Sequence, residues 1–314
     1  MNKKKLFFII QILFVFFPVI AEDEQEQEIL AAFLKTPSFV NLTKDTSLVF
    51  KLNENWMILK GEVNGKSGNF IFDTGANYTV LASEFIKKNA WDNKVISPKI
   101  INVKVMKLNK FKIDQKLEVN DIYVGVISMQ HLSDLTNCSV DGIIGVNLMK
   151  TTPFTIKYND KKIIFHSKNN KENRTPIDLR FENNRIFVTL KINGKKVEFN
   201  IDSGATSTSI LKKDYTGKSK KIGRKMVVDI NGINREVDHI VAIPKSIFIG
   251  KYKINLKTIY VRYVDDTEWG GAKGEPVNLL GISFLKLFDL TIDLSNNKLY
   301  LTPVVEKPNA RPVR

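Results

Sequence analysis

The chain repeats itself, and this internal repeat limits the possible fold more than any other feature of the sequence. Residues 62–81, EVNGKSGNFIFDTGANYTVL, align without a gap with residues 191–210, KINGKKVEFNIDSGATSTSI, at a shift of 129 positions. A second block, residues 141–165, aligns with residues 277–301 at a shift of 136 positions. Similarity at a regular spacing is typical of one structural unit used twice. We therefore expect two copies of one fold within a single chain.

Each copy has the pattern of β-structure. Short β-branched and aromatic runs alternate with Asn, Asp and Gly, and an Asn-Gly pair at 64–65 and again at 193–194 predicts a tight hairpin turn. Helical patterns are confined to four short segments, namely 22–36, 82–90, 145–150 and 282–287. The sequence therefore predicts a mainly-β architecture in two halves.

The N-terminus has the features of a secretory signal. Three lysines precede an apolar stretch that ends at Ala21, directly before an acidic segment. The stretch is too short for a comfortable membrane span. We predict a signal peptide over residues 1–21 and an exported protein, periplasmic or secreted, with no stable membrane insertion after cleavage. The alternative is an uncleaved membrane anchor.

The predicted domains follow from the repeat and the composition of the segments between its copies. They are the signal peptide (1–21), an acidic, partly helical lead (22–44), an N-terminal lobe (45–167), a polar linker (168–175), a C-terminal lobe (176–303) and a tail (304–314). The single cysteine, Cys138, allows no internal disulfide, which favours a bacterial envelope or secreted protein.

The net charge of +15 raises the question of a polyanionic partner. The lysines are scattered over strand-like positions and turns, with few clusters beyond Lys212-Lys213 and the 218–225 run. This distribution is typical of a solvated surface, and we expect no nucleic-acid partner.

An aspartate ends an apolar run in each copy. Asp73 follows Phe70–Phe72, and Asp202 holds the matching position in the second copy. A buried carboxylate is costly unless partners satisfy it. If the copies pack about a twofold axis, Asp73 and Asp202 meet there and share one proton, since two adjacent carboxylates do not both ionise cheaply. One then acts as a base and the other as an acid, with a water between them placed to attack a carbonyl.

The residues after each aspartate fit this interpretation. The hydroxyls of Thr74 and Ser203 can hydrogen-bond across to the opposite turn, and Gly75 and Gly204 permit tight backbone geometry and close approach of another segment.

The two motifs, FDTGA and IDSGA, are each followed some 70 to 80 residues later by two apolar residues and a glycine, IIG and LLG. In this arrangement the chain resembles the retropepsin/pepsin superfamily of aspartic peptidases. The alanine after the glycine, the short copies and the lack of disulfides look closest to bacterial retropepsin-like aspartyl proteases. The resemblance covers nearly the whole chain after the signal peptide.

The resemblance implies two closed β-barrel lobes related by a pseudo-twofold axis, and peptide-bond hydrolysis without metal, cofactor or covalent intermediate. It implies catalytic roles for Asp73 and Asp202, and a hydroxyl grip from Thr74 and Ser203. Gly145 and Gly281 would lie behind the site. The implied substrate-contacting residues are Ala76, Asn77, Ala205, Thr206 and Gly232. Two β-hairpin flaps would cover the substrate, at about 103–113 and 226–238.

The chain departs from the family pattern at several positions. Retropepsins often carry aspartate at the positions of Asn77 and Thr206, and the first flap segment has neither the tyrosine of the pepsin flap nor a glycine. These departures bear on specificity and flap closure rather than on the aspartate pair.

The expected function is that of an exported aspartic endopeptidase acting on a peptide or protein substrate. Because both aspartates lie in one chain, a monomer is expected. One alternative is a non-hydrolytic peptide-binding relative. Another is a glycosidase, which also uses two carboxylates but needs them in unlike surroundings and spaced apart.

Overall fold

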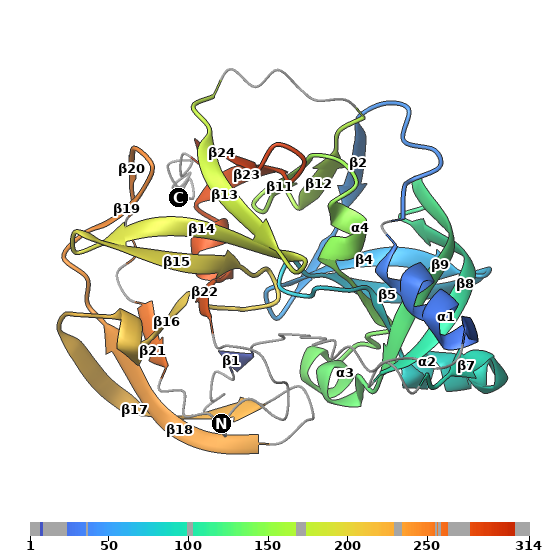
Figure 1. Ribbon diagram of the computed structural model, residues 1–314. Coiled ribbons are helices and arrows are strands. Elements are labelled where there is room, and N and C mark those ends of the chain that lie inside the picture. Colours follow the sequence, from blue (N-terminus) through green and yellow to red (C-terminus); the bar gives the residue numbers. More distant parts are fainter. Residues whose placement is uncertain are drawn as a thin grey trace, which may run out of the picture.

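The computed structural model describes residues 7–8, 24–35, 37–98, 103–167, 174–228, 234–254, 256, 259–262 and 277–304 (Figure 1). Most of the predicted signal peptide and tail, much of the linker, and Gly232 lie outside these residues.

The protein is mainly β, as the sequence predicts. The strands up to the linker are β1 Phe7–Phe8, β2 Thr46–Val49, β3 Lys51–Asn53, β4 Trp56–Val63, β5 Lys66–Phe72, β6 Val80–Ala82, β7 Val95–Ile96, β8 Lys104–Ile113, β9 Leu117–Ile127, β10 Gly142–Ile144, β11 Phe154–Lys157 and β12 Lys162–Phe165. The strands after the linker are β13 Ile177–Glu182, β14 Arg185–Ile192, β15 Lys195–Ile201, β16 Ser209–Leu211, β17 Ser219–Val228, β18 Asn234–Ala242, β19 Ile247–Ile249, β20 Tyr252–Lys253, β21 Ile259–Arg262, β22 Asn278–Leu280, β23 Phe288–Asp293 and β24 Lys298–Pro303.

The helices are short, and those after α1 each follow a strand. They are α1 Glu24–Leu34, α2 Ser83–Lys88, α3 Gln130–Thr136, α4 Val146–Met149 and α5 Ile282–Leu285, with single 3-10 turns η1 Asp92–Lys94 and η2 Lys212–Asp214. Each of the four segments predicted to be helical contains one of these helices, whereas α3 was not predicted. None of the helices in the described part of the chain is long and apolar enough to cross a membrane.

The first copy forms a closed barrel of six strands. Its order is β4-β5-β10-β6-β9-β8, and β8 pairs back with β4. The Asn64-Gly65 turn joins β4 to β5 with φ angles of 46° and 84°. The corresponding turn at Asn193-Gly194 joins β14 to β15 with φ angles of 50° and 89°. Positive φ at both central residues matches the twist of a two-residue hairpin, which explains the Asn-Gly pair in each copy.

The second copy follows the same path with one interruption. Its strands run β14-β15-β22-β16-β21-β18, and closure onto β14 is made by β19. Strand β8 is continuous over 10 residues, whereas its counterpart is split into the end of β18 and β19, with Pro244 between them. Proline has no N–H to donate and fixes its own φ, so regular pairing stops there. The expected closed barrel is therefore complete in the first copy and broken at this proline in the second.

A shared antiparallel sheet joins the two copies. Its order is β13-β24-β23-β11-β12-β2, so β11 of the first copy pairs directly with β23 of the second. Thr155 lies opposite Thr291, its own counterpart in the repeat, and their hydroxyl oxygens are 2.7 Å apart. The pseudo-twofold axis of the molecule therefore passes between these two residues.

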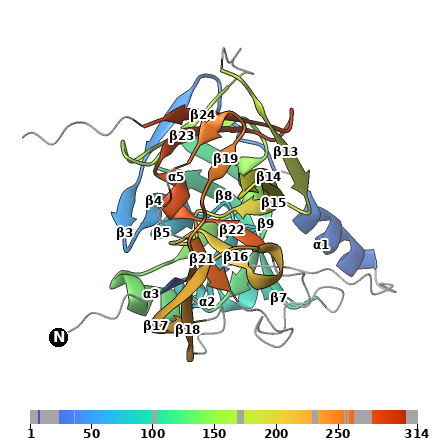
Figure 2. The ribbon, with the colours of Figure 1, turned by 90° about the vertical axis from the view of Figure 1, so that its left-hand side faces the viewer.

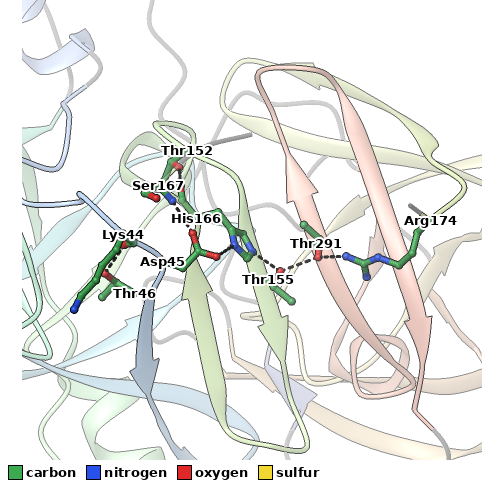
Figure 3. Close-up of polar contacts among 9 residues, drawn as sticks. All are labelled: Lys44, Asp45, Thr46, Thr152, Thr155, His166, Ser167, Arg174 and Thr291. Atoms are coloured by element: carbon green, nitrogen blue, oxygen red, sulfur yellow. Dashed lines mark hydrogen bonds and ion pairs between the residues drawn. The ribbon is translucent and has the colours of Figure 1, made fainter. Parts of the chain in front are cut away.

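A chain of polar side chains crosses this sheet (Figure 3). His166 Nδ1 lies 2.7 Å from a carboxylate oxygen of Asp45, and its other ring nitrogen, Nε2, lies 2.8 Å from the Thr155 hydroxyl. On the far side, Arg174 donates to the Thr291 hydroxyl at 2.7 Å. The contacts connect segments that precede β2 and β13 to both central strands. Both lobes are thus tied to the sheet by polar as well as backbone contacts.

Two hairpins lie at the end of the molecule opposite the shared sheet, as Figures 1 and 2 show for β7 and for β17–β18. The β17–β18 pair occupies the same place beside β21 as the β7–β8 pair occupies beside β9. The counterpart of the second predicted flap is therefore β7–β8. The first flap predicted at 103–113 is wrong in its position, because Phe111–Ile113 are hydrogen-bonded to β4 in the barrel wall. Only the first residues of that segment belong to the hairpin.

Candidate active site

The two aspartates end equivalent strands and are held by equivalent backbone contacts. Asp73 follows β5, and its N–H donates to the carbonyl of Ile144 on β10 at 3.1 Å. Asp202 follows β15, and its N–H donates to the carbonyl of Leu280 on β22, also at 3.1 Å. In each copy the glycine-terminated strand pairs in parallel with the strand that leads into the aspartate. The repeat thus builds the same support under both carboxyl groups.

The turns after the aspartates interlock across the lobes. The Thr74 N–H donates to the Ser203 hydroxyl at 2.9 Å, and the Ser203 N–H donates to the Thr74 hydroxyl at 3.0 Å. Each hydroxyl in turn donates to a carbonyl of the opposite lobe, from Thr74 to Ile201 at 2.9 Å and from Ser203 to Phe72 at 3.0 Å. Both side chains are fully buried. These four bonds fix how the two turns meet.

Backbone donors converge on the two buried carboxyl groups. Asp73 Oδ1 accepts from the N–H groups of Gly75 at 2.7 Å and of Gly204 at 2.9 Å. Asp202 Oδ1 accepts from the N–H groups of Gly204 and Ala205, both at 2.9 Å. Because one N–H, that of Gly204, lies within 2.9 Å of an oxygen of each carboxyl group, the two carboxyl groups are neighbours.

The glycines are required by this close approach. A Cβ atom at Gly75 would lie 2.4 Å from Asp202 Cγ, and one at Gly204 would lie 2.4 Å from Asp73 Oδ2. Neither distance is possible for a real side chain, so each glycine makes room for the carboxyl group of the opposite lobe.

The environment of Asp73 favours its protonated form. Burial raises the pKa of the Asp73 carboxyl well above its usual value of 3.8, and the negative charge of Asp202 raises this pKa further. The N–H groups of Gly75 and Gly204 work in the opposite direction, since they stabilise the carboxylate. Burial and repulsion prevail, so the Asp73 carboxyl keeps its proton above the usual pH range of an aspartate.

Gly145 and Gly281 lie directly behind the two turns. A Cβ atom at Gly145 would lie 2.4 Å from the carbonyl carbon of Tyr78, and one at Gly281 would lie 2.5 Å from the carbonyl oxygen of Ser207. The residue after each glycine donates its N–H to the turn, from Val146 to Ala76 at 2.8 Å in the first copy. Because these glycines have no side chain, the backbone after β10 and β22 packs directly against the aspartate turns.

Polar residues further along each copy brace the same turns. In the first copy, Asn147 Oδ1 accepts from the N–H and the hydroxyl of Thr79, at 2.8 and 2.9 Å. In the second, the Ser283 hydroxyl accepts from the Thr208 N–H at 2.8 Å. Motif reading did not identify these four residues. The repeat alignment contains the signal, because it places Thr79 opposite Thr208 and Asn147 opposite Ser283.

The predicted substrate-contacting residues take different positions. Ala76 and Ala205 are fully buried. Asn77 is buried and donates to the carbonyl of Asn183 in the other lobe at 2.7 Å, while its Oδ1 has no hydrogen-bond partner. The Thr206 hydroxyl is also buried without a partner. Buried polar atoms without partners are uncommon in proteins, and two of those found in the described residues lie at equivalent positions, two residues after the glycine of each turn.

A further contact between the lobes was not predicted. The indole N–H of Trp56 donates to the carbonyl of Gly204 at 2.8 Å. Trp56 begins β4 and thereby ties the first barrel to the aspartate turn of the second. The position that corresponds to Trp56 in the second copy is Arg185, so this contact has no symmetric equivalent.

Among the residues that the structure describes, no group of three or more His, Cys, Asp or Glu side chains is arranged to hold a metal ion.

Comparison with known families gives one match in each half of the chain. A model described as aspartyl protease matches residues 59–148, and one for the gag-polyprotein aspartyl protease matches residues 188–287. Both are retropepsin-like families. The chain therefore carries two retropepsin-like aspartyl protease domains, which fits a bilobal arrangement. No curated protein matches the chain significantly.

Proposed function

We propose that the protein is an exported aspartic endopeptidase whose two catalytic carboxyl groups, Asp73 and Asp202, come from the two lobes of one chain. The observation that carries the proposal is the pair of buried carboxyl groups that share the Gly204 N–H, with the pKa of Asp73 raised. Such a pair shares one proton between two ionisable groups over a wide range of pH.

The shared proton allows the two carboxyl groups to take complementary roles. The ionised carboxyl group takes a proton from a water, whose oxygen then attacks the carbonyl carbon of the peptide bond. The protonated carboxyl group donates its proton to the carbonyl oxygen. When the tetrahedral gem-diol intermediate breaks down, the carboxyl group that took a proton from the water gives it to the amide nitrogen, and the other carboxylate takes a proton back from one of the two hydroxyls. The C=O bond re-forms as the C–N bond breaks and the amine leaves. The pair returns to its singly protonated state.

The matched surroundings of the two carboxyl groups argue against a glycosidase. Glycosidase carboxyl groups are separated by about 5 Å or more so that a sugar, and in inverting enzymes also a water, fits between them. Here a single backbone N–H reaches both carboxyl groups, and each carboxyl group packs on the glycine of the other turn. This geometry supports a pair of carboxyl groups that share one proton and act together on one peptide bond.

Peptide cleavage by single-site variants tests the proposal. The mature protein is incubated with a diverse peptide mixture at several pH values, beside Asp73→Asn, Asp202→Asn and the surface control Asp160→Asn. We expect either site variant to lose cleavage entirely while remaining folded, and the control to retain it. Cleavage near the wild-type rate in either site variant would overturn the assignment.

Binding of a transition-state mimic separates the enzyme from a non-hydrolytic peptide-binding relative. An enzyme should bind a statine peptide at least about 100-fold more tightly than the matching plain peptide, because it is complementary to the tetrahedral state. Equal affinities would favour the binding relative. N-terminal sequencing of the exported protein tests the proposed signal cleavage after Ala21.

A further inference from the structure

A cavity of about 380 Å³ lies on the second lobe, between the β13–β14 hairpin and β15. Its charged lining contains five basic residues and three acidic ones, namely Arg180, Arg185, Lys195, Lys196, Lys213, Glu182, Glu198 and Asp214. A cavity of this size can hold one or two residues of a peptide.

The acidic groups of the cavity are already engaged. Arg180 makes ion pairs with both Glu182 and Glu198, and its guanidinium carbon, Cζ, lies 4.1 Å from the centroid of the Phe187 ring. The third acidic residue, Asp214, accepts from the Asn278 amide at 2.9 Å. None of these three carboxylates makes an ion pair with the other basic residues of the lining, all of which lie in the described part of the chain.

Arg185 is the basic residue that this arrangement leaves unsatisfied. It is half-buried, and burial lowers the pKa of its guanidinium with no carboxylate to oppose the effect. Its Nη2 is fully buried without a hydrogen-bond partner, and no other described residue bonds to or pairs with its side chain. Glu182 lies opposite Arg185 in the hairpin but turns to Arg180 instead. Even a half-buried cation is costly when its innermost nitrogen has neither a hydrogen-bond acceptor nor a counter-charge, and an anionic partner would offset this cost.

The hairpin that carries Arg185 adjoins the proposed active site. The carbonyl of Asn183, in the turn before Arg185, accepts from Asn77 of the first aspartate turn. The next residue, Asn184, accepts from Lys150 of the first lobe at 2.9 Å. A group bound at Arg185 would therefore lie beside the junction of the lobes, where a peptide that crosses the two aspartate turns passes.

We propose that Arg185 binds a carboxylate of the peptide substrate, supported by the unpaired Lys195, Lys196 and Lys213. The planar guanidinium matches a carboxylate with two parallel hydrogen bonds, which gives it specificity that a lysine lacks. The protein then prefers peptides with an acidic residue, or a free C-terminus, at one fixed distance from the cleaved bond. This inference rests on the proposed peptidase function.

Matched peptides test the inference. In otherwise identical peptides, each position in turn is Glu or Gln, and the C-terminus is free or amidated. We expect kcat/KM to favour the acidic member at one position by about tenfold or more. A preference for an internal Glu identifies a side chain as the ligand, whereas a preference for the free C-terminus identifies the terminal carboxylate.

Variants connect the preference to Arg185. Arg185→Gln should reduce the acidic preference to near unity, and Arg185→Lys should retain part of it. Lys191→Gln, which removes an exposed charge from the same strand outside the cavity, should leave the preference unchanged. An acidic preference that survives Arg185→Gln, or the absence of any such preference in an active wild-type protein, overturns the inference.

Binding to a non-cleaving variant keeps this inference distinct from the proposed function. Fluorescently labelled Glu and Gln peptides are titrated onto Asp73→Asn and onto Asp73→Asn/Arg185→Gln. If the wild-type protein cuts no peptide but Asp73→Asn binds the Glu peptide in an Arg185-dependent way, the peptidase proposal fails and the carboxylate site stands. Equal binding of both peptides by Asp73→Asn overturns the site.

Discussion

At the scale of single residues, the buried Asp73 carboxyl group links the stability of the protein to pH. Its pKa is raised in the folded protein, so the folded state holds this proton more tightly than the unfolded chain does. The stability that this proton contributes is fully present below the unfolded pKa of about 3.8, and it is lost as pH rises through the folded pKa. The site therefore costs stability at neutral pH.

Replacing Asp73 by asparagine should remove this cost. We expect Asp73→Asn to unfold at a higher temperature than the wild-type protein at pH 7, with the difference shrinking as pH falls toward 4. Thermal unfolding of both proteins from pH 4 to 7.5 measures the effect, with the exposed Asp160→Asn as control. An Asp73→Asn midpoint at or below that of the wild type at pH 7 contradicts the raised pKa.

The hydroxyls of Thr74 and Ser203 act as one unit, because each accepts from the other turn and donates to the other lobe. Thr74→Ala and Ser203→Ala should each destabilise the protein by about 1–3 kcal/mol, since each leaves buried groups unpaired. The double variant should lose less than the sum of the two. Thr74→Ser keeps the hydroxyl and should be well tolerated.

This coupling is measured by denaturant unfolding of the wild type, the two single variants and the double variant. Peptide cleavage by the same four proteins shows how the loss of each hydroxyl affects the active site. Both single variants should be less active, because the carboxyl groups no longer meet in a fixed geometry. Full additivity of the free energies would show that the two hydroxyls do not depend on each other.

At the scale of elements, α1 packs on the loop that carries Asp73. Phe33 is 1% exposed and stacks on Tyr78 with ring centroids 4.9 Å apart. Burial raises the pKa of Tyr78 to about 12. The same small cluster includes Val105 on β8 and Ile96 on β7. The helix thus holds the first hairpin and the aspartate loop together.

Truncation of Phe33 should loosen both elements. We expect Phe33→Ala to destabilise the protein by about 3–5 kcal/mol, the usual cost of removing a buried phenylalanine. Amide exchange should rise in β7 and in the start of β8, whereas β24, on the shared sheet, should be unaffected. Leu34→Ala, at a side chain 42% exposed on the same helix, is the control. A cost for Phe33→Ala no larger than that of the control would mean that the helix is not anchored there.

Elements with a local signal could be predicted from the sequence, and those fixed by long-range pairing could not. The Asn-Gly turns, the four short helices and the aspartate turns each have a sequence pattern of their own. The position of the first flap had none, because β8 serves both as the second strand of a hairpin and as a barrel wall. The break of the second barrel at Pro244 could not be predicted either, because a proline interrupts a barrel only where its residue would have to pair with a neighbouring strand. That pairing partner is known only from the fold. The contact that Trp56 makes with the other lobe, and the unpartnered guanidinium of Arg185, likewise gave no signal in the sequence.

At the scale of the whole molecule, the pairing of the two turns within one chain predicts a concentration-independent site. Specific activity should stay constant on dilution well below micromolar, because no second chain has to bind. Activity assays over a dilution series, with sedimentation at matching concentrations, make the measurement. A steep loss of activity on dilution would mean that the two carboxyl groups of one working site come from different chains.

The shared sheet has a mechanical consequence. Strands β11 and β23 pair through four residues each, with Thr155 and Thr291 at the centre. Rotating the two lobes apart would break the backbone hydrogen bonds between β11 and β23. We therefore expect the junction between the lobes to be rigid and not to act as a hinge. Any admission of a ligand then falls to the two hairpins at the opposite end of the molecule. We therefore expect the frame that aligns the carboxyl groups to keep one shape whether the site is empty or filled.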